Sequence, residues 1–401
     1  MHWYVSRPIA AFLWSCLAVA GPSQAQTVSS LGQAVEAAWT LSPQARSLAS
    51  RQNELDARSR AASSLFAGPP SLLLSHRTDR LGSNGGLRED EIEVSAPVWT
   101  PAVRRSTSEQ VDADRAALAG QYALAKLKLA AEVRELAAQA AAARIERDIA
   151  QGKLREAQLL AADVERRVKA GDAARVDSLQ AQSTQRQSGA GHALAEGALA
   201  RALSQWRALT GLASVASLDE APGSPQDHPA VLSAQAQLRA AQARLALAQA
   251  DRREPMEVGV GMTRERPASG FASDNSLRLA LRIPLGSASR NASKLAAAQA
   301  EVDEADAQAL AAVRAIEAER DAVRSDLDAA RRAESLAADR ERGSREVQDL
   351  IAKSYRLGES DLPTRLRADN ERFEAELAHA KARLETQRAT ARLNQAYGIL
   401  P

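Results

Sequence analysis

The stretch SLRLALRIPL, Ser276–Leu285, alternates between apolar and polar side chains. Its large apolar residues fall on one face: Leu277, Leu279, Leu281, Ile283 and Leu285. A period of two is typical of a β-strand with one apolar and one polar face. An earlier run, Met256–Arg264, and the turn-rich segment Pro267–Ser276 that follows it complete the pattern of a β-hairpin.

A second hairpin is predicted nearer the N-terminus. The sequence there reads PSLLLSH, then the turn-rich DRLGSNGG, then EIEVSAPV. The last segment alternates in the same way, with apolar positions at Ile92, Val94, Ala96 and Val98 and polar ones at Glu91, Glu93 and Ser95. Two segments of the chain therefore share one pattern.

The two hairpins belong to a tandem duplication. Five Pro or Gly positions recur in the same order at an offset of 186 or 187 residues: Pro43 and Pro229, Pro69 and Pro255, Pro97 and Pro284, Gly171 and Gly358, Gly211 and Gly398. Such an ordered set is not expected by chance. We predict a signal peptide at 1–25, a first repeat at 26–211, a linker at 212–227 and a second repeat at 228–401.

Each hairpin is followed by a helix of unusual length. Residues 102–170 and 287–357 contain no proline, and each helix would be roughly 100 Å long. Return helices are predicted at 175–210 and 361–397, and shorter opening helices at 30–66 and 228–253, so that two short helices lie alongside each long one. At the second turn, we expect Gly358 to reverse the backbone where a Cβ would obstruct it, and Pro363 to lie in the first turn of the return helix.

The apolar face of the strands must be buried, and the sequence leaves two partners open. A soluble sandwich would bury it against another sheet, whereas a transmembrane barrel would turn it toward lipid. Ten residues suffice for a tilted strand to cross a bilayer. Four strands are fewer than the roughly eight of a closed barrel, and open edges are not tolerated in lipid. The strands would then require several chains, and three chains would supply twelve strands.

Composition supports a mainly α fold with a small β part. The chain has 401 residues, 45% hydrophobic and only 3% aromatic, and much of the hydrophobic fraction is Ala, which suits long, closely packed helices. A net charge of +2, with both signs interspersed, gives no indication of a nucleic-acid partner.

The whole predicted mature chain resembles the TolC-like outer membrane efflux proteins, and its short length resembles the CzcC-like branch that serves metal-exporting pumps. The resemblance rests on SLGQAVEAAWTLSPQ near the mature N-terminus, on the duplicated order of elements, on Pro97 and Pro284 at the strand exits, and on the terminal LTG and AYG segments.

The resemblance implies a homotrimer in the outer membrane of a Gram-negative bacterium. Three chains would form a twelve-stranded transmembrane barrel continuous with an α-helical periplasmic tunnel. A periplasmic adaptor protein would dock at the helical tips and connect the tunnel to an inner membrane pump, of RND type in the metal-exporting branch. The cargo would be metal cations, with drugs, dyes and peptides left open.

The resemblance also assigns residues. The family's tip turns carry a Gly followed six residues later by an Asp, as Gly171 and Asp177 do here, whereas Gly358 is followed by Thr364. The predicted adaptor-docking residues are Gly171, Asp177, Leu179, Gly358, Leu362 and Pro363. The predicted lipid-facing residues are Ile92, Val94, Leu277, Leu279, Leu281 and Ile283. The alternative for the tips is a simple solvent-exposed turn between helices.

The N-terminus has the pattern of an export signal. Arg7 precedes the apolar run Ile9–Ala20, and small residues favour cleavage after Ala25. The only cysteine, Cys16, lies inside this segment; lipidation is the alternative to simple removal, but the bulky Trp14 before it favours removal. The mature chain would then have no thiol.

Enzymatic chemistry is not indicated. The five histidines are scattered, and the chain has no catalytic or cofactor-binding motif and no metal-ligand spacing. The sequence thus predicts a passive exit duct for efflux, without catalytic residue, cofactor or bound metal. Two alternatives are a periplasmic coiled-coil adaptor or scaffold and a secreted structural coiled coil.

Overall fold

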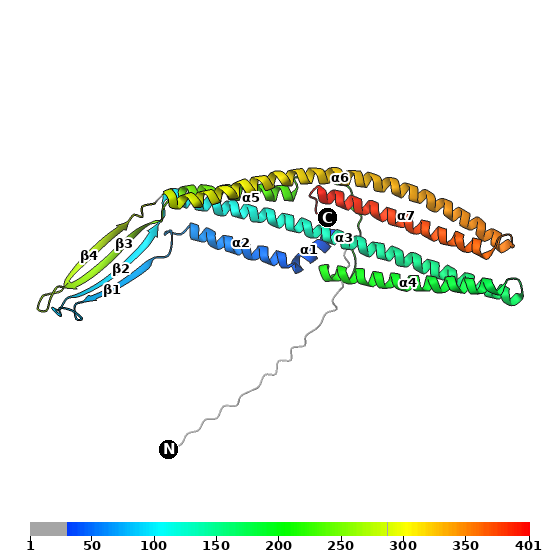
Figure 1. Cartoon of the computed structure of the whole chain (residues 1–401), viewed down its shortest axis with the longest axis horizontal. Coiled ribbons are helices and arrows are strands. Elements are labelled where there is room, and N and C mark those ends of the chain that lie inside the picture. The colour runs from blue at the N-terminus through cyan, green and yellow to red at the C-terminus, as the bar shows by residue number, and fades with distance from the viewer. Residues whose placement is uncertain (1–29, 287) are drawn as a thin grey trace, which may run out of the picture.

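The computed structural model describes residues 30–286 and 288–401, and the predicted signal peptide, with Cys16, lies outside them. The elements are α1 (Leu31–Leu41), α2 (Pro43–Ala62), β1 (Ser71–Thr78), β2 (Arg88–Val98), α3 (Pro101–Ala170), α4 (Arg175–Thr210), α5 (Pro229–Ala250), β3 (Met256–Arg266), β4 (Asp274–Arg282), α6 (Ala288–Leu357) and α7 (Leu362–Ala396). The helices form an elongated bundle with the sheet at one end (Figure 1). The expected fold class is confirmed.

Two very long helices set the length of the molecule. Both α3 and α6 contain 70 residues, which corresponds to about 105 Å each. The return helices α4 and α7 pack against them in the half remote from the sheet, while α2 and α5 accompany α3 in the half next to the sheet (Figure 1). The expected stacking of two short helices beside a long one is confirmed for α3.

The opening helix of the first repeat differs from the prediction. Instead of one helix over 30–66, the structure has α1 and α2, separated at Ser42, whose ψ of 126° is extended. Pro43 follows, and a residue before proline is disfavoured in the α region by a clash with the proline ring. The counterpart of α1 in the second repeat, residues 217–227, is irregular and contains Pro222, Gly223 and Pro225, so the duplication does not extend to this helix.

The four strands form one antiparallel sheet in the order β1-β2-β3-β4. The two predicted hairpins are its outer pairs, and β2 pairs with β3 over their full length, from Arg88 opposite Arg266 to Val98 opposite Met256. The two repeats are therefore joined edge to edge through β2 and β3, which are far apart in the sequence.

The largest core cluster lies in the middle of the bundle, where α1, α3 and the segment after α4 meet. Trp206 of α4 is fully buried there, and its Nε1 donates a hydrogen bond to the Ser214 carbonyl at 3.0 Å. Along the rest of α3 most of the buried side chains are alanines. Small side chains let the helices approach closely, so the core is long and thin rather than thick.

Candidate functional site

The apolar face of the sheet is built by register. Directly paired residues in an antiparallel sheet point to the same side. Leu72, Val94, Val260 and Leu279 form one row across all four strands, and Leu74, Ile92, Met262 and Leu277 form the next. A third row contains Ala96, Val258 and Leu281. All five predicted lipid-facing residues within the strands thus lie on one face, and Ile283 follows β4 directly.

This face is uncovered in the single chain. Leu277 is 73% exposed and Leu279 is 76% exposed, whereas monomeric soluble proteins rarely leave a large contiguous apolar patch in water. Over the part of the chain that the structure describes, no helix lies over the sheet (Figure 1). The sandwich alternative is wrong for the single chain, because its four strands form one sheet and not two.

The opposite face of the sheet is polar and largely self-paired. Arg278 forms an ion pair with Glu91 at 2.5 Å, and it crosses β3 where that strand has Gly261 and no side chain. A Cβ at Gly259 would lie 2.7 Å from the Glu93 carboxylate. Gly259 and Gly261 therefore leave the middle of the polar face of β3 without side chains, so that the long charged side chains of its neighbours can lie across it. Leu73 is the one large apolar residue of this face.

At the other end of the molecule, the two helical tips have the same backbone. Gly171 has φ of 86° and Gly358 has φ of 80°. In the first turn, Asp172 N donates to Arg167 O at 2.8 Å, and in the second Glu359 N donates to Ser354 O at 3.0 Å. The two bonds join corresponding residues of the two repeats. Both helices end with a left-handed glycine, and the amide of the residue after it satisfies a carbonyl of the last turn.

Glycine at the tips is required by the conformation of the backbone itself. A Cβ built at Gly171 or Gly358 would meet nothing within 4 Å. The expected obstruction of a Cβ therefore does not come from neighbouring parts of the molecule. The positive φ is what requires glycine, since an L-residue in this region has its Cβ too close to its own backbone.

The first turns of the two return helices differ. Asp361, a residue the sequence analysis missed, caps α7 by accepting a hydrogen bond from Thr364 N at 2.9 Å, and this bond lowers the pKa of its carboxyl group. Pro363 lies in the first turn of α7, as expected. The first turn of α4 instead contains Asp177, and Ala174 at its N-cap makes no side-chain bond. The acidic residue therefore lies in the first turn of the helix in the first repeat and at the N-cap in the second.

The tips also differ in packing. Leu362 and Leu366 of α7 are buried against Val164 of α3, with exposed fractions of 3% and 8%. Leu179 of α4, the counterpart of Leu366, is 59% exposed. Leu362 is therefore packed inside the molecule and is not available to a partner, whereas Leu179 is exposed.

Side chains of the two tips contact each other. The guanidinium of Arg167 in α3 lies 4.9 Å from the ring centroid of Tyr355 in α6, within cation–π range. Burial raises the pKa of the Tyr355 hydroxyl, which stays neutral at physiological pH. This contact and the Leu362 cluster join the two hairpins.

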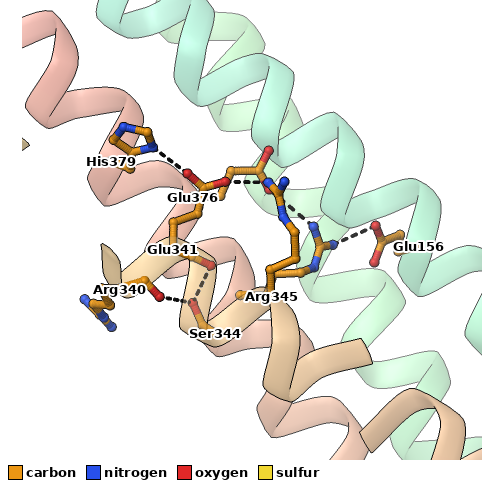
Figure 2. A network of polar contacts seen from close by, with 8 residues as sticks. Glu156, Arg340, Glu341, Ser344, Arg345, Glu376 and His379 are labelled. Carbon is orange, nitrogen blue, oxygen red and sulfur yellow. Dashed lines mark hydrogen bonds and ion pairs between the residues drawn. The ribbon is translucent and has the colours of Figure 1, made fainter. Parts of the chain in front are cut away.

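Behind the tips, charged side chains cross-link the helices (Figure 2). Glu341 of α6 pairs with His379 of α7 and with Arg345 on its own helix. Arg372 of α7 reaches Glu156 of α3 at 2.6 Å. Of these contacts, the Arg372–Glu156 pair joins the two hairpins, since α7 and α3 belong to different repeats.

A second group of residues missed from the sequence lies at mid-length. Arg134 of α3 is 4% exposed and donates to both oxygens of Glu220, at 2.8 and 2.7 Å, and to Gln395 of α7 at 2.7 Å. Asn394 donates to Glu220 as well, at 2.9 Å. This network ties α3, the linker and the C-terminal end of the chain into one unit, and no local pattern marks Arg134 among the other arginines.

The described residues contain no cluster of three or more His, Cys, Asp or Glu side chains that could hold a metal ion. Among the same residues, no helix is both long enough and apolar enough to cross a membrane.

These features define a class of protein: an uncovered amphipathic four-stranded sheet at one end of paired helical hairpins about 100 Å long. Residues 224–399 match the model of the outer membrane efflux protein family. No curated protein sequence matches the chain. This match covers the second repeat, and it agrees with the resemblance of the whole chain to the TolC-like outer membrane efflux proteins.

Solved structures agree on the fold. The CmeC outer membrane channel of Campylobacter jejuni is 13% identical with a TM-score of 0.73, covering 98% of this chain and 94% of its own. The MtrE outer membrane channel of Neisseria gonorrhoeae, in an open state, is 16% identical with a TM-score of 0.73, covering 92% and 89%. VceC, an outer membrane protein of Vibrio cholerae, is 16% identical with a TM-score of 0.71, covering 92% and 96%.

Proposed function

We propose that this outer membrane efflux protein is the exit duct of a tripartite pump and that it works as a homotrimer. The uncovered apolar face of the sheet is the observation that carries the proposal, because it needs a lipid environment. The strands β1 and β4 have free edges, and in lipid such edges must be paired. Three chains, joined β1 to β4, would close a barrel of twelve strands and remove every edge.

The helices form the second part of the proposed duct. Each chain would contribute one repeat over 26–211 and one over 228–401, with 212–227 between them, and the helices of three chains would continue the barrel as a periplasmic tunnel. Export would be passive, and the energy would come from an inner membrane pump, which the resemblance suggests is of RND type.

The tips are proposed to dock a periplasmic adaptor. In the first tip Gly171 sets the turn, Asp177 lies in the first helical turn and Leu179 is 59% exposed. In the second tip Gly358 and Pro363 set the corresponding turn. An exposed leucine beside an acidic residue, at the free end of a helical hairpin, suits a helical partner with a small apolar contact and a basic residue.

The cargo is proposed to be heavy-metal cations. This rests on the resemblance to the short, CzcC-like branch. Deletion of the gene should lower the tolerated concentration of a divalent metal salt; sensitivity to dyes or drugs with unchanged metal tolerance would assign another cargo and leave the duct intact.

Cysteine cross-linking tests the trimer, because the predicted mature chain has no cysteine of its own. Ser75→Cys on the edge strand β1 would be combined in turn with Ser276→Cys, Arg278→Cys and Ala280→Cys on β4, so that three registers between subunits are sampled. At least one combination should give oxidised species of two and three subunits in membranes, while each single variant gives dimers at most. A protein recovered as an uncross-linked monomer in the soluble periplasm would instead favour an adaptor or scaffold.

A further inference from the structure

The face of the sheet that carries the apolar rows changes character toward its far end. Beyond the row that contains Leu74 and Ile92, the next row is His76, Asp90, Arg264 and Asn275, and the last is Thr78, Arg88 and Arg266. Consecutive rows are about 7 Å apart along the strands. Both polar rows lie at the end remote from the helices (Figure 1). One continuous face therefore passes from leucine to arginine within two rows.

The positive charge in these rows is unbalanced. We call Arg88, Arg264 and Arg266 the basic rim. Arg88 is directly opposite Arg266, and like charges in that position destabilise a sheet. Arg266 donates to the Gly86 carbonyl at 3.3 Å. Arg88 and Arg264 are exposed and form no ion pair with any residue that the structure describes.

Three acidic residues near the rim are engaged elsewhere, and Glu265 and Asp274 lie on the opposite face of the sheet. Asp90, on the same face, is bound by His76 at 2.6 Å. Glu89 pairs with Arg77 on the opposite face of the sheet. Asp79, in the turn after β1, accepts hydrogen bonds from Ser83 and from the Gly86 amide. The rim is thus left as a set of arginines without counter-ions, at a position where their repulsion costs stability.

We infer that the basic rim binds the phosphate groups of lipid headgroups in the outer leaflet of the outer membrane. The guanidinium group is suited to this because it is always charged and matches phosphate oxygens in pairs. The inference rests on the proposed function, since it needs the apolar rows to face lipid. A lipid fits better than free phosphate because its acyl chains would contact the Leu74 and Ile92 row while its headgroup reaches the arginines.

The test uses the assembled full-length protein in detergent micelles, with diphosphorylated lipid A as the probe and native mass spectrometry to count bound lipid. The double variant Arg88→Gln, Arg264→Gln should bind the probe roughly tenfold more weakly than the wild type, as expected for the loss of charged hydrogen bonds. Arg77→Gln is the matched control at the same level of the opposite face, and it should stay within about twofold. Arg266 is kept because it supports the turn.

Two further arms identify the ligand. Dephosphorylated lipid A should bind weakly to all variants, and inorganic phosphate at the same phosphate concentration should not compete. Equal loss in Arg77→Gln, full binding by the double variant, or equal binding of the dephosphorylated lipid would each overturn the inference. Pore conductance in a planar bilayer separates the two proposals: a conducting double variant with normal lipid binding rejects the rim alone, whereas no conductance by the wild type rejects the duct.

Discussion

The two repeats have the same backbone at their tips but opposite arrangements of side chains. Both turns end a 70-residue helix with a left-handed glycine and the same hydrogen bonds. Yet Leu366 of the second tip is buried at 8%, whereas its counterpart Leu179 is exposed at 59%. The two copies thus share the glycines that the backbone conformation requires. They differ in which leucines are buried, because each copy has different neighbours in the bundle.

The two repeats also differ in side-chain contacts at the middle of their long helices. The residue that occupies the position of Arg134 in the second repeat is Asp321, whose side chain is 81% exposed and pairs only with Arg324 on its own helix. Arg134 is surrounded by the linker and α7, and the linker is present only once. The second repeat contacts the linker through a different arginine, Arg320 of α6, which donates to the Gln226 and Ala396 carbonyls and not to a carboxylate there.

The largest effect is expected at this junction. Arg134→Ala leaves Glu220, whose side chain is 11% exposed, without its cation, which should lower the free energy of unfolding by about 3–5 kcal/mol. Asp321→Ala, the matched change in the other repeat, should alter it by less than about 0.5 kcal/mol. Denaturant midpoints in detergent measure both. Similar midpoints for the two variants would mean that the network does not stabilise the chain.

The next prediction tests the tips. Leu366→Ala removes a buried side chain and should destabilise the protein by about 2–5 kcal/mol. Leu179→Ala should leave the midpoint within about 0.5 kcal/mol, because its side chain is exposed, and should weaken binding of the adaptor measured by co-purification. The proposed role of the first tip fails if Leu179→Ala binds the adaptor normally.

The sheet offers a comparison across both repeats. Ile92 and Leu279 occupy the same position in the two copies, and Ile92→Arg and Leu279→Arg should each cost about 2–4 kcal/mol if they lie near the bilayer midplane. Their polar-face neighbours also correspond, and Glu91→Gln and Arg278→Gln should insert and assemble normally. Yield of folded protein in lipid vesicles measures all four. Equal tolerance on the two faces would exclude lipid as the partner of the apolar face.

A smaller effect is expected from the tip glycines. Gly171→Ala and Gly358→Ala should each cost about 1–2 kcal/mol, since alanine must adopt a positive φ. Gly343→Ala, within α6 and with open space around it, should instead stabilise the protein by about 0.5–1 kcal/mol. Thermal midpoints compare them. Unequal losses at the two tips would show that something other than backbone conformation keeps these glycines.

The smallest effect concerns pH at the start of α5. His228 accepts a hydrogen bond from Ala230 N through Nδ1 and donates from Nε2 to the Gln395 carbonyl, so it is held neutral. Burial lowers its pKa below the ordinary 6.5, despite the opposing effect of the Gln395 carbonyl. As pH falls below 6.5, the unfolded chain takes up the proton first. Stability is therefore complete above that pH and declines below it.

The measurement is the thermal midpoint between about pH 7.5 and pH 5. His228→Asn keeps a side chain able to cap the helix and should reduce the slope with little change at the upper pH. Ser42, the corresponding residue of the first repeat, makes no side-chain cap bond, so Ser42→Ala should leave the slope unchanged. An unchanged slope in His228→Asn would assign the acid sensitivity to other groups.

Local features were predictable because they depend on a few neighbouring residues. The alternation from Leu277 to Leu281 predicted β4 and its apolar face, and the spacing of Gly171 and Gly358 predicted both tips. Alternation of side chains along a strand, or a single left-handed glycine at a turn, depends only on its own segment. The sequence by itself therefore determined the element order, the duplication and the amphipathic faces.

What the tertiary structure alone decided depends on residues far apart in the chain. The burial of Leu362, the environment of Arg134 and the pairing of β2 with β3 all require knowing which surfaces meet. The same holds for the basic rim, since Arg88 and Arg266 become neighbours only through the register of two strands from different repeats. Sequence periodicity gives each element its faces, but the free energy of packing selects the partner that each face contacts.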